Sequence, residues 1–228
     1  MDHIHLAPRK WSNAELRRFA ALFSGSVVNV SAWRDEDKEG MKYRSYFFNA
    51  KSYSLTNYDS DMRGFQGQQD EIFLNLEKIL PDELVENFDV VFNHTTLEHI
   101  YDFWTAFQNL CAMSRDIVII VVPFVQQMHA NYGDFWRFTP QAIKHMFEEQ
   151  GLEVAYLSFN NGFRDSVYIF CIASKQPSRW RQKLPFRTTY IDESFPHLSE
   201  PFAGCNAIHS NWKTTLKGWL ISSFSFRK

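Results

Sequence analysis

The most informative segment of this chain is Phe88-Asp-Val-Val-Phe-Asn-His-Thr-Thr-Leu-Glu-His-Ile100, which is followed by an amphipathic segment and then by Asp116-Ile-Val-Ile-Ile-Val-Val-Pro-Phe124. Two short apolar runs with a helix-length segment between them predict a buried parallel strand, a crossover helix and a second strand. In an open α/β sheet, ligands bind beyond the carboxyl ends of such strands. Residues 93–99 and the segment from Pro123 onward are therefore expected to surround a functional site.

The remaining patterns extend this unit in both directions. Upstream, a helix is expected to begin at the cap Ser12-Asn-Ala-Glu15 and to close at Gly25, and strands are expected at 27–30, 52–58 and 71–76. Downstream, the expected elements are a helix at 101–113, a strand at 117–124, a helix from Thr139 to Gly151, and a hairpin of strands 152–159 and 167–174. The chain is therefore expected to form an α/β fold, a Rossmann-like and mostly parallel sheet with helices on both faces and a C-terminal antiparallel hairpin.

Composition indicates one globular body with an extension. The 228 residues are 45% hydrophobic and 22% charged, as in ordinary soluble proteins. Residues 1–174 contain 15 basic and 23 acidic residues, whereas residues 175–228 contain 9 basic and 3 acidic residues. We expect a domain at 1–175 and a basic, aromatic C-terminal extension at 176–228. The acidic body argues against nucleic acid as a ligand, and the basic extension could contact an anionic surface.

The C-terminal extension contains an apolar stripe at helical spacing, formed by Trp212, Leu216, Trp219, Leu220 and Phe224. Such a stripe could lie on an anionic membrane or dock on a partner protein. The plainer interpretation is that it packs on the protein's own core or on a second subunit of a homodimer.

The rest of the chain suggests a cytoplasmic protein. The N-terminus lacks the apolar core of a signal peptide, and the longest apolar run, 117–124, is too short to span a bilayer. The three cysteines lack metal-binding spacing, so we expect reduced thiols and no metal site.

Several spaced motifs follow one another in a characteristic order: Phe88 to Val91, Leu97-Glu98-His99, Val122-Pro123-Phe124, His129, and Asp134-Phe-Trp-Arg-Phe-Thr-Pro140. With these motifs, residues 25–174 resemble the class I S-adenosylmethionine-dependent methyltransferases of the type 11-like subgroup. The resemblance implies S-adenosyl-L-methionine as the cofactor. It also points towards polysaccharide biosynthesis, with O-methylation of a sugar or glycan intermediate as the expected reaction.

The first loop departs from this family. Its members usually have an acidic residue and a glycine-rich turn after the first strand, because glycine lets the backbone approach the cofactor closely. This chain has Asn29-Val-Ser-Ala-Trp-Arg-Asp35 there, with no glycine before Gly40. Either the cofactor is held in a different pose, or the site serves another purpose. The second case describes a non-catalytic binding or scaffold protein that has lost the cofactor.

The resemblance implies a set of cofactor-binding residues: Ser31, Ala32, Asp59, Asn75 and Asn93. Asp59 follows the second strand, where a carboxylate can accept hydrogen bonds from both ribose hydroxyls. The alternative is that Asn57 and Asp59 have no binding role and simply end the strand by forming a turn. Asn75 replaces an aspartate that often lies near the adenine amino group, and an amide oxygen can still accept from an amine.

Two histidines are the candidate catalytic residues. His94 ends the fourth strand, and a neutral imidazole with a pKa near ~6.5 can remove a proton from an attacking hydroxyl. His129 is the alternative base. His99 is an expected substrate-binding residue, and the alternative is that it packs against the sheet. Glu98 could have no role beyond complementing a helix dipole.

The loop at 126–138 is the candidate acceptor-binding segment. It mixes His, Asn, Tyr, Asp, Trp and Arg side chains, which suits recognition of a polyhydroxylated acceptor by hydrogen bonds and stacking. Asp134, Trp136 and Arg137 are the expected substrate-binding residues. Asp134 and Arg137 could equally form a salt bridge that fixes the loop.

Overall fold

The computed structural model describes residues 3–59, 64–129, 133–160, 162, 165–188, 203–204 and 207. The α-helices are α1 (His3–Phe19), α2 (Phe103–Met113), α3 (Pro140–Glu149) and α4 (Pro177–Trp180). The strands are β1 (Ser26–Val30), β2 (Ser52–Asn57), β3 (Glu71–Phe73), β4 (Phe88–His94), β5 (Ser114–Val125), β6 (Glu153–Phe159), β7 (Val167–Ser174) and β8 (Arg187–Thr188). Short 3-10 helices are η1 (Ala20–Leu22), η2 (Tyr43–Ser45), η3 (Asp82–Leu84) and η4 (Leu97–His99).

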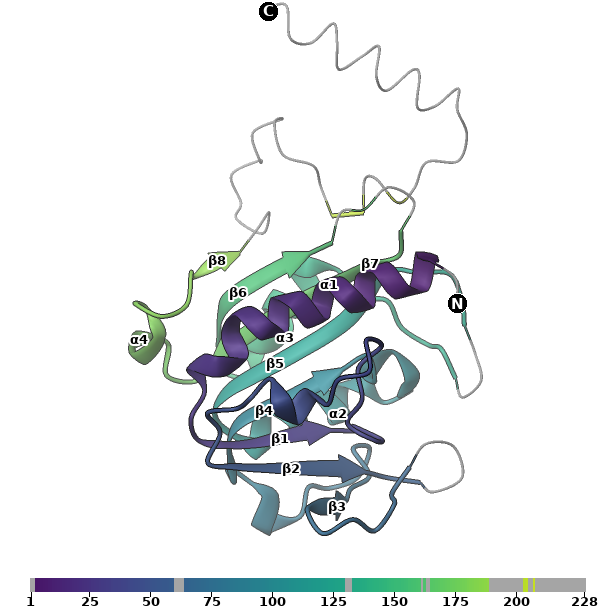
Figure 1. The fold of residues 1–228 in the computed structure, drawn as a ribbon. Helices are drawn as coiled ribbons and strands as arrows, with labels where there is room; N and C mark the ends of the chain where they lie inside the picture. Colours follow the sequence, from purple (N-terminus) through teal and green to yellow (C-terminus); the bar gives the residue numbers. More distant parts are fainter. Residues whose placement is uncertain are drawn as a thin grey trace, which may run out of the picture.

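The strands form one mixed sheet in the order β3-β2-β1-β4-β5-β7-β6-β8 (Figure 1). Strands β1 to β5 run parallel to one another, and β7 lies antiparallel between β5 and β6. The chain proceeds outward from β1 to β2 and β3, and then returns to pair β4 with the other side of β1. This reversal creates a topological switch point at the carboxyl ends of β1 and β4, where open α/β sheets bind ligands. The expected fold class is confirmed.

Helices cover both faces of the sheet. On one face, α2 and α3 pack against inward side chains such as Val28 and Val91. On the other face, α1 and the region of η2 pack against Val27, Val90 and Phe92. Figure 1 shows α1 lying across the front of the sheet, over β5 and β7, with α3 behind. The alternation of neighbouring residues between two cores explains why the strands read as continuous apolar runs.

Several element boundaries differ from the expectations, among them the starts of α1 and β5 and the end of β3. The first helix begins at His3 rather than at Ser12, because Ser12 Oγ bonds to Arg9 O at 2.9 Å inside the helix instead of capping it. The third strand ends at Phe73 rather than at residue 76. There, Asn75 Oδ1 accepts a hydrogen bond from Glu77 N at 2.9 Å and closes a turn.

The first part of the C-terminal extension packs on the body. Trp180 is 5% exposed and contacts the core beneath α1, and β8 pairs with β6. The boundary at residue 175 stays a prediction, and the apolar stripe from Trp212 to Phe224 lies outside the described residues. No helix in the described part is long and apolar enough to cross a membrane. Cys111 and Cys171 are buried free thiols.

Candidate active site

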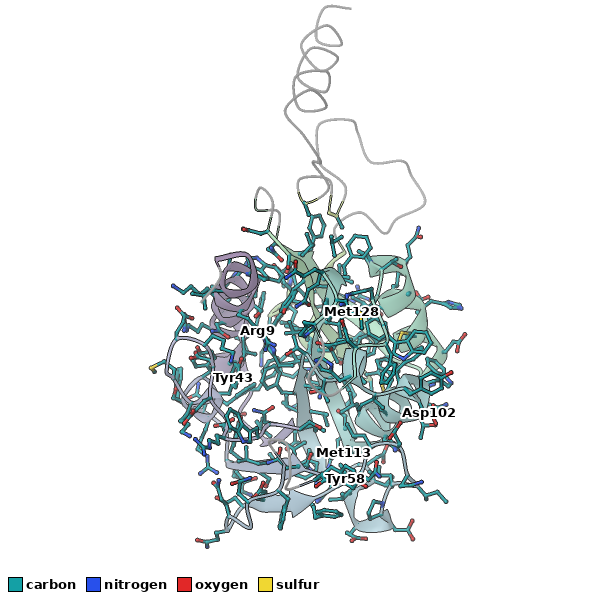
Figure 2. The ribbon with its side chains drawn as sticks, turned by 90° about the vertical axis from the view of Figure 1, so that its right-hand side faces the viewer. Arg9, Tyr43, Tyr58, Asp102, Met113 and Met128 are labelled. Atoms are coloured by element: carbon teal, nitrogen blue, oxygen red, sulfur yellow. The ribbon has the colours of Figure 1, made fainter. Side chains whose placement is uncertain are left out.

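A cavity of about 310 Å³ opens at the carboxyl ends of β1, β2 and β4. Such a volume is at the lower end of the usual range for small-molecule sites, ~300–1,000 Å³. Figure 2 looks onto this edge of the sheet, with Arg9 and Tyr43 near each other on one side and Tyr58 lying further along. The lining residues are Arg9, Asn29, Ser31, Ala32, Trp33, Glu36, Lys38, Tyr43, Tyr58, Asp59, Gly64, His94, Thr95, Thr96 and His99.

The first loop follows a backbone path that normally requires glycine. Ser31, Trp33 and Asp35 have φ angles of 57°, 49° and 59°, in the left-handed region. Each such residue costs about 1–2 kcal/mol relative to a right-handed conformation. Buried hydrogen bonds offset this strain, because Asp35 Oδ1 accepts from Asn29 Nδ2 at 2.8 Å and from Tyr53 Oη at 2.7 Å. The loop therefore adopts the positive φ angles that glycine usually provides, although it contains no glycine.

Asn57, the last residue of β2, holds this loop in place. Its Oδ1 accepts from Trp33 N at 2.6 Å, and its Nδ2 donates to Trp33 O at 3.1 Å and to Glu71 Oε1 at 2.5 Å. The amide of Asn57 therefore binds the backbone of the first loop and the side chain of Glu71 on β3. Asp59, two residues further along, lines the cavity and is the carboxylate that this strand end presents to it.

His94 at the end of β4 is fastened to α1 by both ring nitrogens. Arg9 Nη1 lies 3.1 Å from His94 Nδ1, and Ser12 Oγ lies 2.9 Å from His94 Nε2. Because a guanidinium can only donate, Nδ1 accepts from Arg9, and the ring proton is therefore on Nε2 and points at Ser12. Burial, together with the charge of Arg9, lowers the pKa of His94 well below its usual value. His94 is a neutral link between β4 and α1.

Next to it, η4 presents His99 and Glu98. His99 Nδ1 donates to Gly133 O at 2.6 Å, so a neutral ring has its lone pair on Nε2. This Nε2 lies 3.7 Å from Glu98 Oε1. Glu98 is fully buried, and neither carboxyl oxygen has a hydrogen-bond partner within the described part of the chain. Burial raises the pKa of Glu98 to about 7 and lowers that of His99.

The loop after β5 is fixed by an ion pair. Arg137 Nη1 and Nη2 donate to Asp134 Oδ1 and Oδ2 at 2.5 and 2.7 Å, and Asp134 Oδ2 also accepts from His129 N at 2.9 Å. The bonds from Arg137 lower the pKa of Asp134 to about 2. Trp136 Nε1 donates to the carbonyl oxygens of Ile100 and Tyr101, each at 3.1 Å. The salt bridge considered from the sequence is therefore present.

The cavity gathers some of the expected site residues and not others. Those that line it are Ser31, Ala32, Asp59, His94 and His99. Those that do not are Asn75, Asn93, His129, Asp134, Trp136 and Arg137. Asn93 is fully buried beneath the switch point, where its Nδ2 donates to Val30 O at 3.0 Å and links β4 to β1.

The remaining walls can be compared with the chemistry of a nucleoside methyl donor. The carboxylate of Asp59 suits a ribose diol, and the rings of Trp33 and Tyr58 suit a base. Trp33 is part of the cavity wall and does not fill the cavity of about 310 Å³. The residues present therefore fit such a molecule. For a metal ion they offer less: no cluster of three His, Cys, Asp or Glu side chains that could hold one occurs in the ranges that the structure describes.

The sequence patterns missed Arg9, Tyr43 and Gly133 as residues of this site, and they missed the burial of Glu98. Arg9 and Tyr43 come from segments outside the strand ends, so no local pattern marks them. Glu98 and Gly133 stand within quoted motifs or beside them, yet their roles depend on contacts across the site.

Comparison with solved structures finds methyltransferases. A protein from Bacillus halodurans that is assigned as a methyltransferase is 13% identical, and the match covers 71% of this chain and 97% of that chain with a TM-score of 0.54. An S-adenosylmethionine-dependent methyltransferase from Clostridium acetobutylicum is 7% identical over 75% of this chain and 92% of its own, with a TM-score of 0.52.

A third similar structure contains ligands. The 1,6-didemethyltoxoflavin-N1-methyltransferase of Burkholderia thailandensis, with 1,6-didemethyltoxoflavin and S-adenosylhomocysteine bound, is 13% identical over 75% of this chain and 79% of its own, with a TM-score of 0.51. No protein-family model matches the sequence, and a comparison with curated proteins finds no match. These identities establish the fold alone.

Proposed function

Since the chain has the fold of the class I S-adenosylmethionine-dependent methyltransferases, we propose that it is such an enzyme and that it methylates a small molecule. The observation that carries this proposal is the cavity at the switch point of β1 and β4. In open α/β sheets this is the ligand-binding position. The loop that lacks glycine still follows a glycine-like path there and leaves the cavity open.

S-Adenosylmethionine would supply a methyl group on a sulfonium, which a nucleophile can attack directly. For the donor, we propose that Asp59 binds the ribose and that Ser31 and Ala32 lie against the methionine portion. Asn75 and Asn93 are the further cofactor-binding residues predicted from the sequence. The cavity offers the first three directly, because all of them line it.

For the acceptor, we propose a hydroxyl of a sugar or glycan intermediate, as the motifs of the subgroup suggest. His94, Thr95, Thr96 and His99 form the β4 side of the cavity, next to the position proposed for the donor. Asp134, Trp136 and Arg137 are the predicted acceptor-binding residues of the neighbouring loop, with His94 or His129 as the predicted base. In the described structure, Trp136 N donates to Glu98 O of η4, whereas Asp134 and Arg137 pair within the loop. None of the three lines the cavity, so they would act on the acceptor mainly by positioning.

Calorimetric titration of the full chain tests donor binding. S-Adenosylmethionine and S-adenosylhomocysteine should bind in the micromolar range, and Asp59→Ala should weaken both by about tenfold or more, as expected for a charged hydrogen-bond acceptor worth ~1.5–3 kcal/mol. Asp82→Ala, which removes an exposed carboxylate in η3 at the opposite end of the sheet, is the matched control and should bind normally.

The same titration decides between the enzyme and its rival, a binding or scaffold protein that no longer accepts the donor. The rival is favoured by the commitment of Asn57 to the Trp33 backbone at the end of β2. If the folded chain, shown to unfold cooperatively, gives no binding heat at millimolar S-adenosylmethionine, the enzyme hypothesis is wrong and the scaffold hypothesis is supported.

A further inference from the structure

We propose that the methyl acceptor carries a carboxylate and that Arg9 on α1 binds it. This inference rests on the proposed function and deepens it, because it names a charged group of the acceptor and the side chain that selects it. Arg9 lines the cavity and bonds to His94, on the β4 side that is proposed for the acceptor. Figure 2 shows Arg9 at this edge of the sheet, near Tyr43.

The guanidinium of Arg9 is held by neutral groups. Its Nη1 donates to His94 Nδ1 at 3.1 Å, and its Cζ atom lies 5.7 Å from the centre of the Tyr168 ring. These contacts orient the guanidinium but do not compensate its charge. Since an arginine side chain has five N–H donors, its described neighbours leave donors for a ligand in the cavity.

The carboxyl group that acts most strongly on Arg9 does not bond to it. Glu98 acts on Arg9 through space, yet neither Glu98 oxygen has a hydrogen-bond partner among the described residues. Burial also raises the pKa of Glu98 to about 7, so this carboxyl group is only partly ionised at neutral pH. A cation that is partly withdrawn from water without a bonded anion is costly, and a bound carboxylate would remove that cost.

The β4 side is the positive part of the cavity. Lys38 also lines the cavity, and the charges of Arg9 and Lys38 both oppose protonation of His94. His94 is therefore neutral and adds no further charge. The carboxylates that line the cavity belong to Glu36 in the first loop and to Asp59 after β2, away from the end of β4.

The balance of charge favours a carboxylate over a phosphate. The side chains that line the cavity include two cations and two carboxylates, whose charges cancel. S-Adenosylmethionine has one net positive charge, because its sulfonium and ammonium groups outweigh its carboxylate. An acceptor with one carboxylate makes the filled cavity neutral, whereas a phosphate dianion leaves an excess negative charge in it. A planar carboxylate also matches the two parallel N–H groups of a guanidinium.

Nitrogen spectra of the His94 ring test the carboxylate site in the full chain, with His94→Gln as the assignment variant. Acetate at constant ionic strength should shift the Nδ1 signal saturably, because Nδ1 accepts from the guanidinium that acetate binds. Acetamide, which has the same shape without the charge, should not. Arg9→Gln keeps an N–H donor for His94 and should abolish the acetate response. No saturable response, or one that persists in Arg9→Gln, would overturn the proposal.

Matched acceptor pairs test the selection. Calorimetry of the chain saturated with S-adenosylhomocysteine compares methyl β-D-glucuronide with methyl β-D-glucoside, and 4-hydroxybenzoate with 4-hydroxybenzamide. At least one carboxylate should bind about tenfold or more tightly than its neutral counterpart, and Arg9→Gln should abolish that difference. Arg9→Lys keeps the charge but not the paired donors, so it should retain part of the difference.

The matched control is Arg115→Gln, which should preserve the difference in affinity. Arg115 pairs with Asp89 at the opposite end of the sheet, and its side chain is 46% exposed. A purely structural role of Arg9 would weaken both members of a pair equally in Arg9→Gln, which would contradict the proposal. Equal affinities within both pairs, or no binding by any of the four compounds, would also overturn it.

The donor has a carboxylate of its own, so its binding is measured in the same variants. Arg9→Gln should leave the affinities for S-adenosylhomocysteine and for 5′-methylthioadenosine, which lacks the carboxylate, unchanged. If only S-adenosylhomocysteine is weakened, by about tenfold, Arg9 binds the donor and the assignment to the acceptor is wrong. If the native chain binds neither nucleoside, the proposed function fails, and the acetate response alone decides whether Arg9 binds a carboxylate.

Discussion

The carboxyl group of Glu98 is buried at an energetic cost. It is fully buried, and neither oxygen accepts a hydrogen bond from the described residues. Native proteins rarely retain such a group unless its chemistry is used, because an isolated buried charge costs several kcal/mol. The strain of Ser31, Trp33 and Asp35 is concentrated at the same edge of the sheet. Individual residues in and around the cavity therefore lower the stability of the folded state.

This leads to a prediction for stability against pH. Because the folded pKa of Glu98 is about 7, raised from 4.5 by burial, the folded state binds a proton that the unfolded state has lost between these values. Stability therefore falls as pH rises from about 4.5 to 7. Glu98→Gln should stabilise the protein by about 3 kcal/mol at pH 8 and by little at pH 4. Urea denaturation at both pH values measures this.

The control for that experiment is Glu83→Gln, which changes an exposed carboxylate in η3. It should leave stability unaltered at both pH values. A Glu98→Gln variant that is no more stable than the native chain at pH 8 would show that the carboxyl group has a compensating partner.

Between elements, the loop after β5 and the turn η4 support each other. Phe135 N donates to Glu98 O at 2.8 Å, and Gly133 O accepts from His99. Gly133 has a φ of +88°, and a Cβ there would lie 2.6 Å from a carbon of the Phe135 ring. Only glycine can therefore present this carbonyl to His99 without displacing the aromatic ring.

Gly133→Ala is expected to be more damaging than the same change elsewhere. Gly40 has nearly the same φ, +86°, but open space around the added methyl group. Gly40→Ala should cost only the backbone strain of about 1–2 kcal/mol. Gly133→Ala should cost about 1–3 kcal/mol more, because of overpacking, and should also lower kcat. Thermal unfolding and turnover of both variants measure the difference, and equal losses would contradict the steric argument.

In the whole molecule, α1 connects parts of the sheet that are far apart. Arg9 and Ser12 contact His94 on β4, while Glu15 accepts hydrogen bonds from Tyr156 and from Ser158 on β6. The helix thus joins the parallel half of the sheet, which forms the cavity, to the antiparallel half. We infer that the cavity wall formed by α1 is as stable as the core.

A substitution within α1 tests this inference. Glu15 is 8% exposed, and Glu15→Ala would leave Tyr156 Oη and Ser158 Oγ without the carboxylate oxygen that accepts their hydrogen bonds. We expect a loss of about 3 kcal/mol in one cooperative transition. Glu83→Ala, at an exposed position, is the control and should change little. A separate early transition in Glu15→Ala would instead show that α1 unfolds independently.

Local patterns were sufficient to predict that β1 to β7 and α1 to α3 exist and follow in this order, although α4 and β8 were not predicted. The apolar runs at β4 and β5, the cap Thr139 of α3 and the hairpin of β6 and β7 all follow from periodicity and turn chemistry, which act over a few residues. The position of the site follows from the strand order as well. For the same reason, Asp59, His94 and His99 could be placed at the cavity from their positions after strands.

The contacts and proton positions within the site depend on tertiary packing. Arg9 meets His94 across 85 residues of sequence, and the amide of Asn57 meets the backbone of Trp33 only after β1 and β2 have paired. The tautomers of His94 and His99, and the pKa of Glu98, arise from neighbours that are remote in the chain and from exclusion of water. Sequence periodicity encodes which face of an element is buried, whereas proton positions depend on which groups meet inside the folded protein.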